Sequence, residues 1–530
     1  MKKRVKKIIG WGLFTLLVMA VSSIFVADHL LPPASGRPST ALALAEADTP
    51  LDRELVPLLA RHPGQTGAIL LPDGIDAYAA RAISARQAGR SLDLQYYIWH
   101  DDLTGRMLAN EAWEAAERGV RVRILLDDTT SDGQDYRIGA LAAHPNVQIR
   151  VFNPLHLGRS NAITRTMGRL LHLSLQHRRM HNKLMLVDGS LAIVGGRNLG
   201  DEYFEADQAM NFTDIDLLGA GPVAEQLARS FDEYWNNQLS VPIQRFLWWQ
   251  PKASGLDKAR RQLRDYLQQA RQDNSEQYQR LMQYKQEPQL QQWLDELIWA
   301  PGEAMWDAPE KLLAEGIPAT SLLLTTQLAP TMQAVSRELT LISAYFVPTA
   351  SGVEYLAERA GAGVTVRILT NSLEATDVPA VHGGYAPYRR ELLEHGVRLF
   401  ELRRQPQQEP SYSFLGESES SLHSKAAVFD QEKVFIGSLN FDPRSVLWNS
   451  EVGVLVESHE LAREVHRLTL EGMSPALSYE VRLEERDGRQ QLVWIAEDGG
   501  RLRVLEKEPG GLWRRFNAWF ADVIGLEKML

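Results

Sequence analysis

Hydrophobic and polar residues alternate in two short stretches of the chain, residues 91–99 and 120–126, and a helical pattern at 107–118 separates them. Alternation with a period of two is typical of a strand, whereas apolar residues spaced three or four apart are typical of a helix. A strand, a helix and a second strand in this order favour a parallel crossover. A further helix is expected at 74–87. The pattern therefore predicts an α/β domain.

The same order of elements returns in the second half of the chain. A strand is expected at 339–347, a helix near 353–360 and another strand at 364–369. The string GVRVRILL at 119–126 recurs as GVTVRILT at 363–370, which is 244 residues later. A repeated order of elements with a repeated string indicates a duplicated domain.

The N-terminus combines a basic start, MKKRVKK, with an uncharged apolar run over residues 8–26. This run is long enough to cross the hydrocarbon core of a bilayer as one helix. We expect an uncleaved anchor. The alternative is a cleaved secretory signal, although the apolar core of a signal is normally shorter. The basic flank predicts that the body of the protein lies on the non-cytoplasmic side.

The segments outside the two repeats have their own patterns. Residues 31–50 are rich in Pro, Ser and Ala and suit a tether. Residues 256–297 are expected to form a helical, partly solvated insertion, with a lid or lipid-contacting arm as the alternative. Turn signals within 479–505 predict a small β meander. Residues 512–530 carry Trp and Phe at helical spacing, which suits packing on the domain or lying in a membrane interface.

These patterns divide the chain into six predicted parts. They are a membrane anchor at 1–30, a tether at 31–65, a first α/β domain at 66–245, a mainly helical insertion at 246–318, a second α/β domain at 319–470, and a meander with an amphipathic helix at 471–530.

Composition excludes several classes of function. The net charge of -10 and a pI near 5.8 argue against a protein that binds nucleic acid through a broad basic face. The chain has no cysteine, which excludes disulfides, thiolate metal sites and a cysteine nucleophile. We therefore expect no nucleic-acid partner.

Two stretches, 180–198 and 422–440, share one arrangement: His, any residue, Lys, four residues, Asp, then a Gly-containing turn that ends in Asn. In an extended segment the His and Lys side chains leave the same face. An imidazole that can act as nucleophile, acid or base, beside an ammonium that binds anionic oxygen, suits phosphate chemistry. The polar members of the motifs are His181, Lys183, Asp188 and Asn198 in the first and His423, Lys425, Asp430, Ser438 and Asn440 in the second.

With these paired motifs, the chain resembles the phospholipase D superfamily, whose two HKD motifs meet between two similar α/β domains. The resemblance covers about residues 70–457. The strings YYIWHDDLTGR, RRMHNKLMLVDG, VGGRNLGDEYF, SAYFVPTASGV, ILTNSLEATDV and FIGSLNFDPRS are similar to bacterial cardiolipin synthases of the C type. The resemblance implies two α/β/α sandwich domains in a pseudo-twofold pair, besides the expected N-terminal transmembrane helix. It implies no metal and no other cofactor.

The resemblance also implies a covalent mechanism. One motif histidine attacks phosphorus to form a phosphohistidine, and the other protonates the leaving alcohol and then deprotonates the incoming one. The sequence leaves open which histidine is the nucleophile, with a slight preference for His181 over His423. The groups expected to donate to the phosphoryl oxygens are Lys183, Lys425, Asn198, Asn440 and Ser438.

Each histidine needs a carboxylate that fixes its tautomer. The aligned strings TDIDLLGAG and SEVGVLVES indicate Asp214 and Glu451 for this purpose. Asp188 and Asp430 follow buried runs into turns, so we predict a structural role for them. The motifs also differ at one position, because Gly196 stands where the second motif has Ser. The first half therefore lacks one hydroxyl donor.

By this resemblance, the protein is expected to transfer a phosphatidyl group to phosphatidylglycerol and so form cardiolipin. The donor is phosphatidylethanolamine or a second phosphatidylglycerol, and membrane phospholipids are the expected partners. The expected location is the bacterial inner membrane, with the catalytic body on the periplasmic side. A phospholipase D that uses water as the acceptor, a nuclease and a non-catalytic lipid-binding protein are the alternatives. The sequence leaves the donor and the oligomeric state open.

Overall fold

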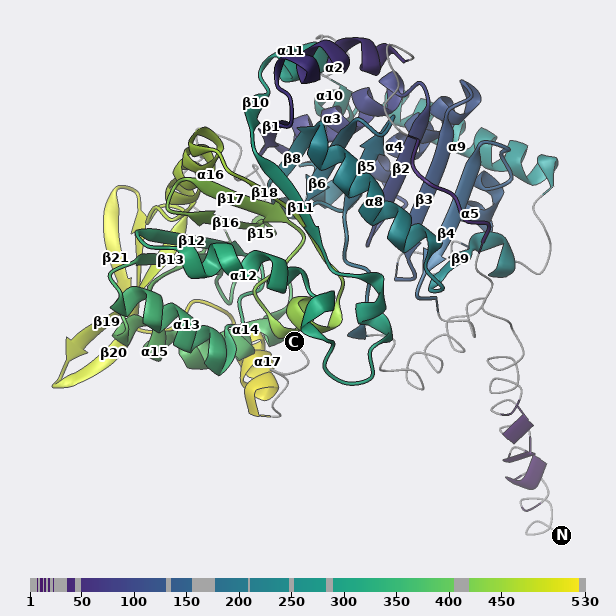
Figure 1. Cartoon of the computed structure of the whole chain (residues 1–530). Helices are drawn as coiled ribbons and strands as arrows, with labels where there is room; N and C mark the ends of the chain where they lie inside the picture. Colours follow the sequence, from purple (N-terminus) through teal and green to yellow (C-terminus); the bar gives the residue numbers. More distant parts are fainter. Residues whose placement is uncertain are drawn as a thin grey trace.

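The computed structural model describes residues 36–42, 49–129, 135–154, 177–207, 210–246, 252–282, 289–404 and 419–523, together with nine positions between 7 and 22. Two large sheets dominate these ranges, and helices cover their faces (Figure 1). No helix within the described ranges is long and apolar enough to cross a membrane. The predicted span at 8–26 lies mostly outside the described residues.

The first half of the chain forms a nine-stranded sheet in the order β10-β1-β8-β6-β5-β2-β3-β4-β9. Strands β2, β3 and β4 are parallel, which confirms the predicted crossover. Helices α3 (Gly74–Gln87) and α4 (Leu103–Glu117) pack on one face, and α8 (Pro222–Asn236) packs on the other. The strands are β1 (Thr66–Leu71), β2 (Ser91–Tyr96), β3 (Arg121–Asp127), β4 (Val147–Phe152), β5 (Leu184–Val187), β6 (Leu191–Gly195), β8 (Asp216–Ala220), β9 (Ser240–Pro242) and β10 (Ile298–Ala300).

The second half repeats this topology in a ten-stranded sheet, β11-β18-β17-β16-β12-β13-β14-β19-β20-β21. Helix α13 (Thr349–Gly361) packs on its outer face, and α16 (His459–Gly472) shares one continuous core with α8 between the sheets. The equivalent strand order confirms the duplication. The strands are β11 (Gly302–Trp306), β12 (Glu338–Ser343), β13 (Thr365–Asn371), β14 (Arg398–Leu402), β16 (Lys425–Phe429), β17 (Lys433–Gly437), β18 (Val452–Val456), β19 (Ser478–Arg486), β20 (Arg489–Asp498) and β21 (Arg501–Leu505).

The described part of the predicted tether is not a free linker. Residues 36–42 lie against the first domain, where the backbone N–H of Ala41 donates to Asp232 of α8. Helix α2 (Pro50–Arg61) follows and buries Leu51 and Leu55. A capping box between Thr49 and Asp52 starts this helix. The domain therefore begins earlier than residue 66.

The predicted insertion is only partly helical. Helices α9 (Ala253–Asp273), α10 (Glu276–Met282) and α11 (Gln289–Asp295) confirm the helical expectation. The residues after them do not belong to an insertion, because β10 pairs with β1 in the first sheet and β11 pairs with β18 in the second. These two strands lead the chain from one sheet to the other (Figure 1).

The predicted C-terminal meander is also part of a domain. Strands β19, β20 and β21 are antiparallel, as expected from the turn signals. However, β19 pairs with β14 and takes the position that β9 has in the first sheet. The meander therefore extends the second sheet and is not a separate unit. Helix α17 (Leu512–Val523) ends the described chain.

Candidate active site

Backbone pairing between the two halves positions both motif histidines. The short strand β15 (Glu419–Leu422) runs parallel to β7 (Met210–Thr213), and the N–H of His423 donates to Thr213 at 2.8 Å. On the other side, the N–H of His181 donates to the carbonyl of Ser450 at 2.9 Å. Each histidine is thus bonded through its backbone to the residue that precedes the carboxylate of the opposite half.

The side chains cross between the halves in the same way. His181 Nδ1 lies 2.9 and 3.0 Å from the two oxygens of Glu451. His423 Nδ1 lies 2.7 Å from Asp214 Oδ2. A carboxylate that accepts the Nδ1 proton leaves the lone pair on Nε2. The sequence indicated these four residues, but it did not show that each acid serves the histidine of the other half.

The two carboxylates are held differently. Ser438 donates to Glu451 at 2.5 Å and accepts the N–H of Val452. In the first half, Asp214 itself accepts the N–H of the following residue at 2.8 Å. A Cβ atom at Gly196 would lie 2.4 Å from both Asp214 oxygens, so only glycine leaves room for this shorter acid. The glycine and aspartate of one half therefore replace the serine and glutamate of the other.

This geometry changes the role expected for Ser438. A hydroxyl has one proton, and here that proton is directed at Glu451. In this arrangement Ser438 positions the carboxylate and has no proton left for a phosphoryl oxygen. The expectation from the sequence treated this hydroxyl as a free donor, and it stays a prediction beside the role that this hydrogen bond indicates.

Two buried lysines lie beside the histidines. Lys183 Nζ donates to the carbonyl of His181 at 2.7 Å, and Lys425 Nζ donates to the carbonyl of His423. Lys425 Nζ also lies 3.0 Å from His423 Nδ1. Both lysine side chains are 1% exposed, and burial lowers the pKa of each. The lysines hold their ammonium groups in a site that solvent screens weakly.

Burial and the two lysines also shift the histidines. Burial, then Lys183 and Lys425, lower the pKa of His181 well below its usual value. Burial and Lys425 lower the pKa of His423, while Asp214 opposes this change. Both imidazoles are therefore neutral near pH 7 in the free protein.

The paired carboxylates differ in their protonation. Burial raises the pKa of Glu451 to about 7. Burial acts in the same direction on Asp214, but Lys425 and the hydrogen bond from His423 outweigh it and lower the pKa of this acid. At neutral pH Asp214 is ionised, whereas Glu451 is close to its titration point.

The two motif asparagines are buried near the histidines. Asn198 accepts from the N–H of Ile98 at 3.2 Å and donates to the Tyr203 hydroxyl at 2.9 Å. The Oδ1 atom of Asn440 has no hydrogen-bond partner among the described residues. Asn198 is therefore fixed by protein contacts, whereas Asn440 keeps an unpaired acceptor oxygen.

Aromatic rings that the sequence reasoning missed enclose the imidazoles. Tyr97 packs edge-on to His181 with 4.9 Å between ring centroids, and Tyr203 packs edge-on to His423 at 5.3 Å. Tyr97 follows directly after β2, so an aromatic residue at the carboxyl end of a central strand was the available signal.

Asp188 and Asp430 lie away from the histidines, at the opposite ends of β5 and β16. Asp188 accepts the backbone N–H groups of residues 89–91, and Asp430 accepts those of residues 336–338. Both residues have positive φ angles, +54° in each case. They fasten the turn after the motif strand to the start of the neighbouring strand, in line with the structural role predicted for them.

Two groups of described residues contain atoms that could hold a metal ion. They are His100 with Asp102 and Glu202, and His382 with Glu401 and Glu508. Neither group contains a motif histidine. In the second group Arg389 donates to Glu508 at 2.5 Å, and in the first His100 lies 3.1 Å from Glu202. Ion pairs account for both groups, so we assign no metal to them.

A family model described as "Cardiolipin synthase, PLD-like domain" matches residues 83–235 and 328–470, which include both motifs. Cardiolipin synthase C of Escherichia coli strain K12 is 38% identical over 483 residues, covering 90% of this chain and 98% of the relative. An uncharacterized protein of Helicobacter pylori strain 26695 is 31% identical, and the match covers 86% of this chain and 87% of the relative.

The fold also matches a solved structure. The phosphatidylserine synthase of Haemophilus influenzae superposes with a TM-score of 0.56 at 11% identity, over 90% of this chain and all of that chain. At this identity the likeness shows the fold alone, and it confirms the α/β architecture. The family model and the Escherichia coli relative go further, and together they show that the chain belongs to the cardiolipin synthase family of proteins with phospholipase D-like domains.

Proposed function

We propose that the protein is a phosphatidyltransferase that forms cardiolipin through a phosphohistidine. The observation that carries the proposal is the crossed pairing of two histidines with two carboxylates beside two buried lysines. One imidazole can attack phosphorus while the other exchanges a proton with the alcohol. Because each histidine depends on the carboxylate of the other half, a single half cannot complete the site.

His181 is the nucleophile in this proposal, and His423 is the general acid and base. The lone pair of His181 Nε2 attacks phosphorus, the bond from phosphorus to the head-group oxygen breaks, and His423 gives its proton to that oxygen. The hydroxyl of phosphatidylglycerol then gives a proton to His423 and attacks phosphorus, so that the bond to nitrogen breaks. The strongly lowered pKa of His181 supports its role as nucleophile.

The general acid must carry a proton when the substrate binds. An anionic phosphodiester between the imidazoles adds a negative charge beside His423 and favours its protonated form. Ionised Asp214 acts in the same direction. His423 therefore takes up a proton from solvent when the substrate binds. Lys183, Lys425 and the asparagines stabilise the charge on the phosphoryl oxygens in the transition state.

The proposed location is the bacterial inner membrane, with one N-terminal span and the catalytic body on the periplasmic side. Helix α17 supports contact with lipid. Its residues Ala518 and Ala521 pack on the protein. Its large apolar side chains are exposed, among them Trp513 at 72% and Trp519 at 57%. An amphipathic helix with exposed Trp and Phe suits the interfacial zone of a bilayer.

Product analysis tests the reaction. The purified full chain would be incubated in micelles with labelled phosphatidylglycerol, with and without phosphatidylethanolamine. Cardiolipin as the product supports the proposal, and the dependence on phosphatidylethanolamine identifies the donor. Phosphatidic acid alone would show a phospholipase D instead.

Trapping the intermediate tests the assignment of the nucleophile. His423→Ala is expected to accumulate label on the protein from a substrate with an activated leaving group, because that step needs no acid. His181→Ala is expected to take up no label. The reverse pattern would assign the nucleophile to His423.

A further inference from the structure

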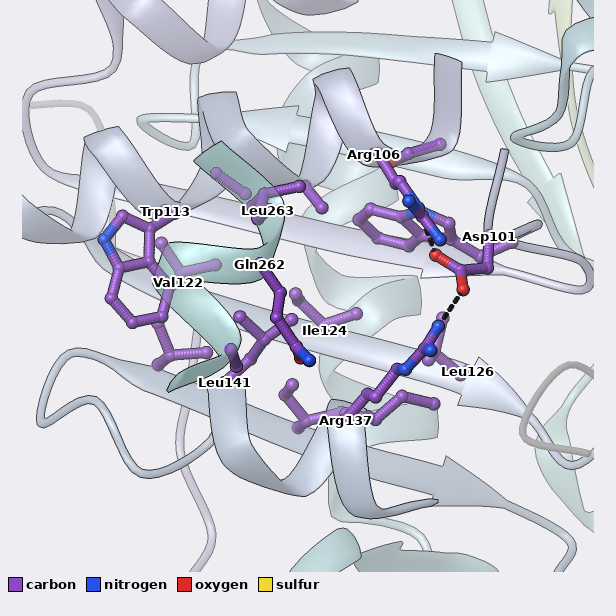
Figure 2. Close-up of a pocket in the computed structure, with 18 of the residues that line it drawn as sticks. Asp101, Arg106, Trp113, Val122, Ile124, Leu126, Arg137, Leu141, Gln262 and Leu263 are labelled. Atoms are coloured by element: carbon purple, nitrogen blue, oxygen red, sulfur yellow. Dashed lines mark hydrogen bonds and ion pairs between the residues drawn. The ribbon is translucent and has the colours of Figure 1, made fainter. Parts of the chain in front are cut away.

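The first domain contains an apolar cavity of about 400 Å³ that the proposed chemistry does not use. It lies between the sheet, where β3 and β4 form the floor, and helices α4, α5 (Asp135–Leu141) and α9. This volume is in the range of small-molecule sites. Figure 2 shows the side chains that line it.

The two ends of the cavity differ in chemistry. Trp113, Val122 and Leu141 lie at one end, and this end is apolar (Figure 2). Asp101 lies at the other end, where Arg106 donates to it at 2.6 Å and Arg137 also donates to it. Asp265 of α9 also lines the cavity, so basic and acidic side chains both occur there. The cavity therefore combines an apolar chamber with a charged mouth.

The charged mouth lies at the same edge of the sheet as the candidate active site. Leu126 lines the mouth, and the next residue, Asp127, accepts the N–H of Met180 beside the motif histidine. Trp99 also lines the cavity, two residues after the tyrosine that packs on the imidazole. The carboxyl ends of parallel strands meet at one edge, where ligands bind in open α/β sheets.

Helix α9 forms a roof over the cavity. Leu263 and Gln262 of α9 face the chamber, yet the helix buries no residue fully. Two contacts fasten it to α4. The guanidinium of Arg106 lies over the ring of Tyr266, and Arg260 forms an ion pair in which both side chains are 36% exposed. Exposed pairs of this kind contribute little stability. Such contacts hold the roof less tightly than a buried interface would.

We infer that this cavity binds one acyl chain of the phospholipid substrate, with α9 as its roof. The inference rests on the proposed function, because that function supplies a substrate with a long apolar chain and a phosphodiester. A phosphodiester held at the histidines brings the glycerol backbone and the start of its chains to this edge of the sheet. The aliphatic and aromatic walls of the cavity complement such a chain.

A chain held in the cavity would keep the phosphatidyl group on the protein after the head alcohol leaves. The P–N bond of the intermediate already holds the phosphoryl group, and the buried chain limits its motion while the acceptor enters. The inference thus assigns to the insertion a part in substrate binding.

The first test measures how the rate depends on chain length. Soluble phosphatidylglycerols with four-, six- and eight-carbon chains would be used below their micellar concentrations, with the full chain in a steroid-based detergent. In water each buried methylene contributes about 0.8 kcal/mol, or about fourfold in kcat/KM. The wild type is expected to show a steep rise with chain length.

Variants that fill the cavity should remove this rise. Ala109→Trp on α4 and Ala259→Trp on α9 both place a ring in the chamber. Each is expected to lower kcat/KM at least tenfold for eight-carbon chains and less than twofold for four-carbon chains. Glu114→Trp, at an exposed position of α4, is the matched control and should follow the wild type. The same steep profile in both cavity variants would overturn the inference.

The second test does not depend on turnover. A phosphatidylglycerol with a photoreactive diazirine at the end of one chain would be crosslinked to the wild-type protein, and labelled peptides would be identified by mass spectrometry. The inference is supported if label is found near Trp113 and Leu263 and if ordinary phosphatidylglycerol displaces that label. Label confined to other surfaces contradicts it. If label enters the cavity but neither the wild type nor any variant forms cardiolipin, the proposed function is wrong and the lipid-binding site still stands.

Discussion

Replacing Gly196 by alanine should separate Asp214 from His423 and slow the chemical step. The new Cβ atom would lie 2.4 Å from both Asp214 oxygens, while ordinary contact begins at 3.4 Å, so the carboxylate must move by about 1 Å. The hydrogen bond to His423, now 2.7 Å, would then exceed hydrogen-bonding distance. A misplacement of about 1 Å at a catalytic group lowers the rate by about 100-fold. Complete loss of the supporting carboxylate sets the limit at about 10,000-fold.

The assay is the rate of cardiolipin formation from labelled phosphatidylglycerol in micelles, with kcat and KM measured separately. The expected loss is in kcat, because the alanine displaces the carboxylate that supports His423. Asp214→Ala and the double variant with Gly196→Ala complete a cycle. If the alanine acts through Asp214, it should have no further effect once that carboxylate is gone. A kcat within twofold of the wild type in Gly196→Ala, or an additive loss in the double variant, would refute this reasoning.

Glu451→Gln should change how stability depends on pH, because the folded protein holds a proton on Glu451 up to about pH 7 whereas the unfolded chain loses it near the usual value. The wild type therefore loses stability as the pH rises through 7. Between pH 5 and pH 8 the free energy of unfolding of the glutamine variant should rise relative to that of the wild type, by up to about 3 kcal/mol. A constant difference between the two in denaturant unfolding across this range would contradict the raised pKa. Asp188→Asn should lower the free energy of unfolding by about 1–3 kcal/mol and leave kcat within twofold, since its carboxylate accepts three backbone N–H groups away from the site. A large loss of kcat in the folded variant would instead give Asp188 a part in catalysis. Trp519→Glu should lower the rate of phosphatidyl transfer at least tenfold in phosphatidylglycerol bilayers and leave the rate in micelles unchanged. Asn517→Ser is the control. Equal rates for the variant and the wild type in bilayers would argue against contact of α17 with lipid.

Local periodicity was sufficient to predict much of the fold. The helix expected at 74–87 is α3, with the same bounds, and the strands expected at 120–126 and 364–369 are β3 and β13 within a residue or two. These elements are long and strongly patterned, and their environment matches their own preference. The helix α2 was missed although Thr49, Pro50 and Asp52 carry its start signal, because a Pro- and Ala-rich composition ahead of it suggested a tether.

The sequence by itself determined the chemistry of the site, because two copies of His, Lys and Asn at one spacing require two similar half-sites. Only the tertiary structure decided how the halves combine. The register of β15 against β7, and of Met180 against Ser450, brings each histidine to the carboxylate of the other half. Those pairings join residues more than 200 positions apart, and no local pattern records them. The same holds for the Ser438 proton and for the cavity beneath α9, since both depend on which groups meet after the sheets have formed.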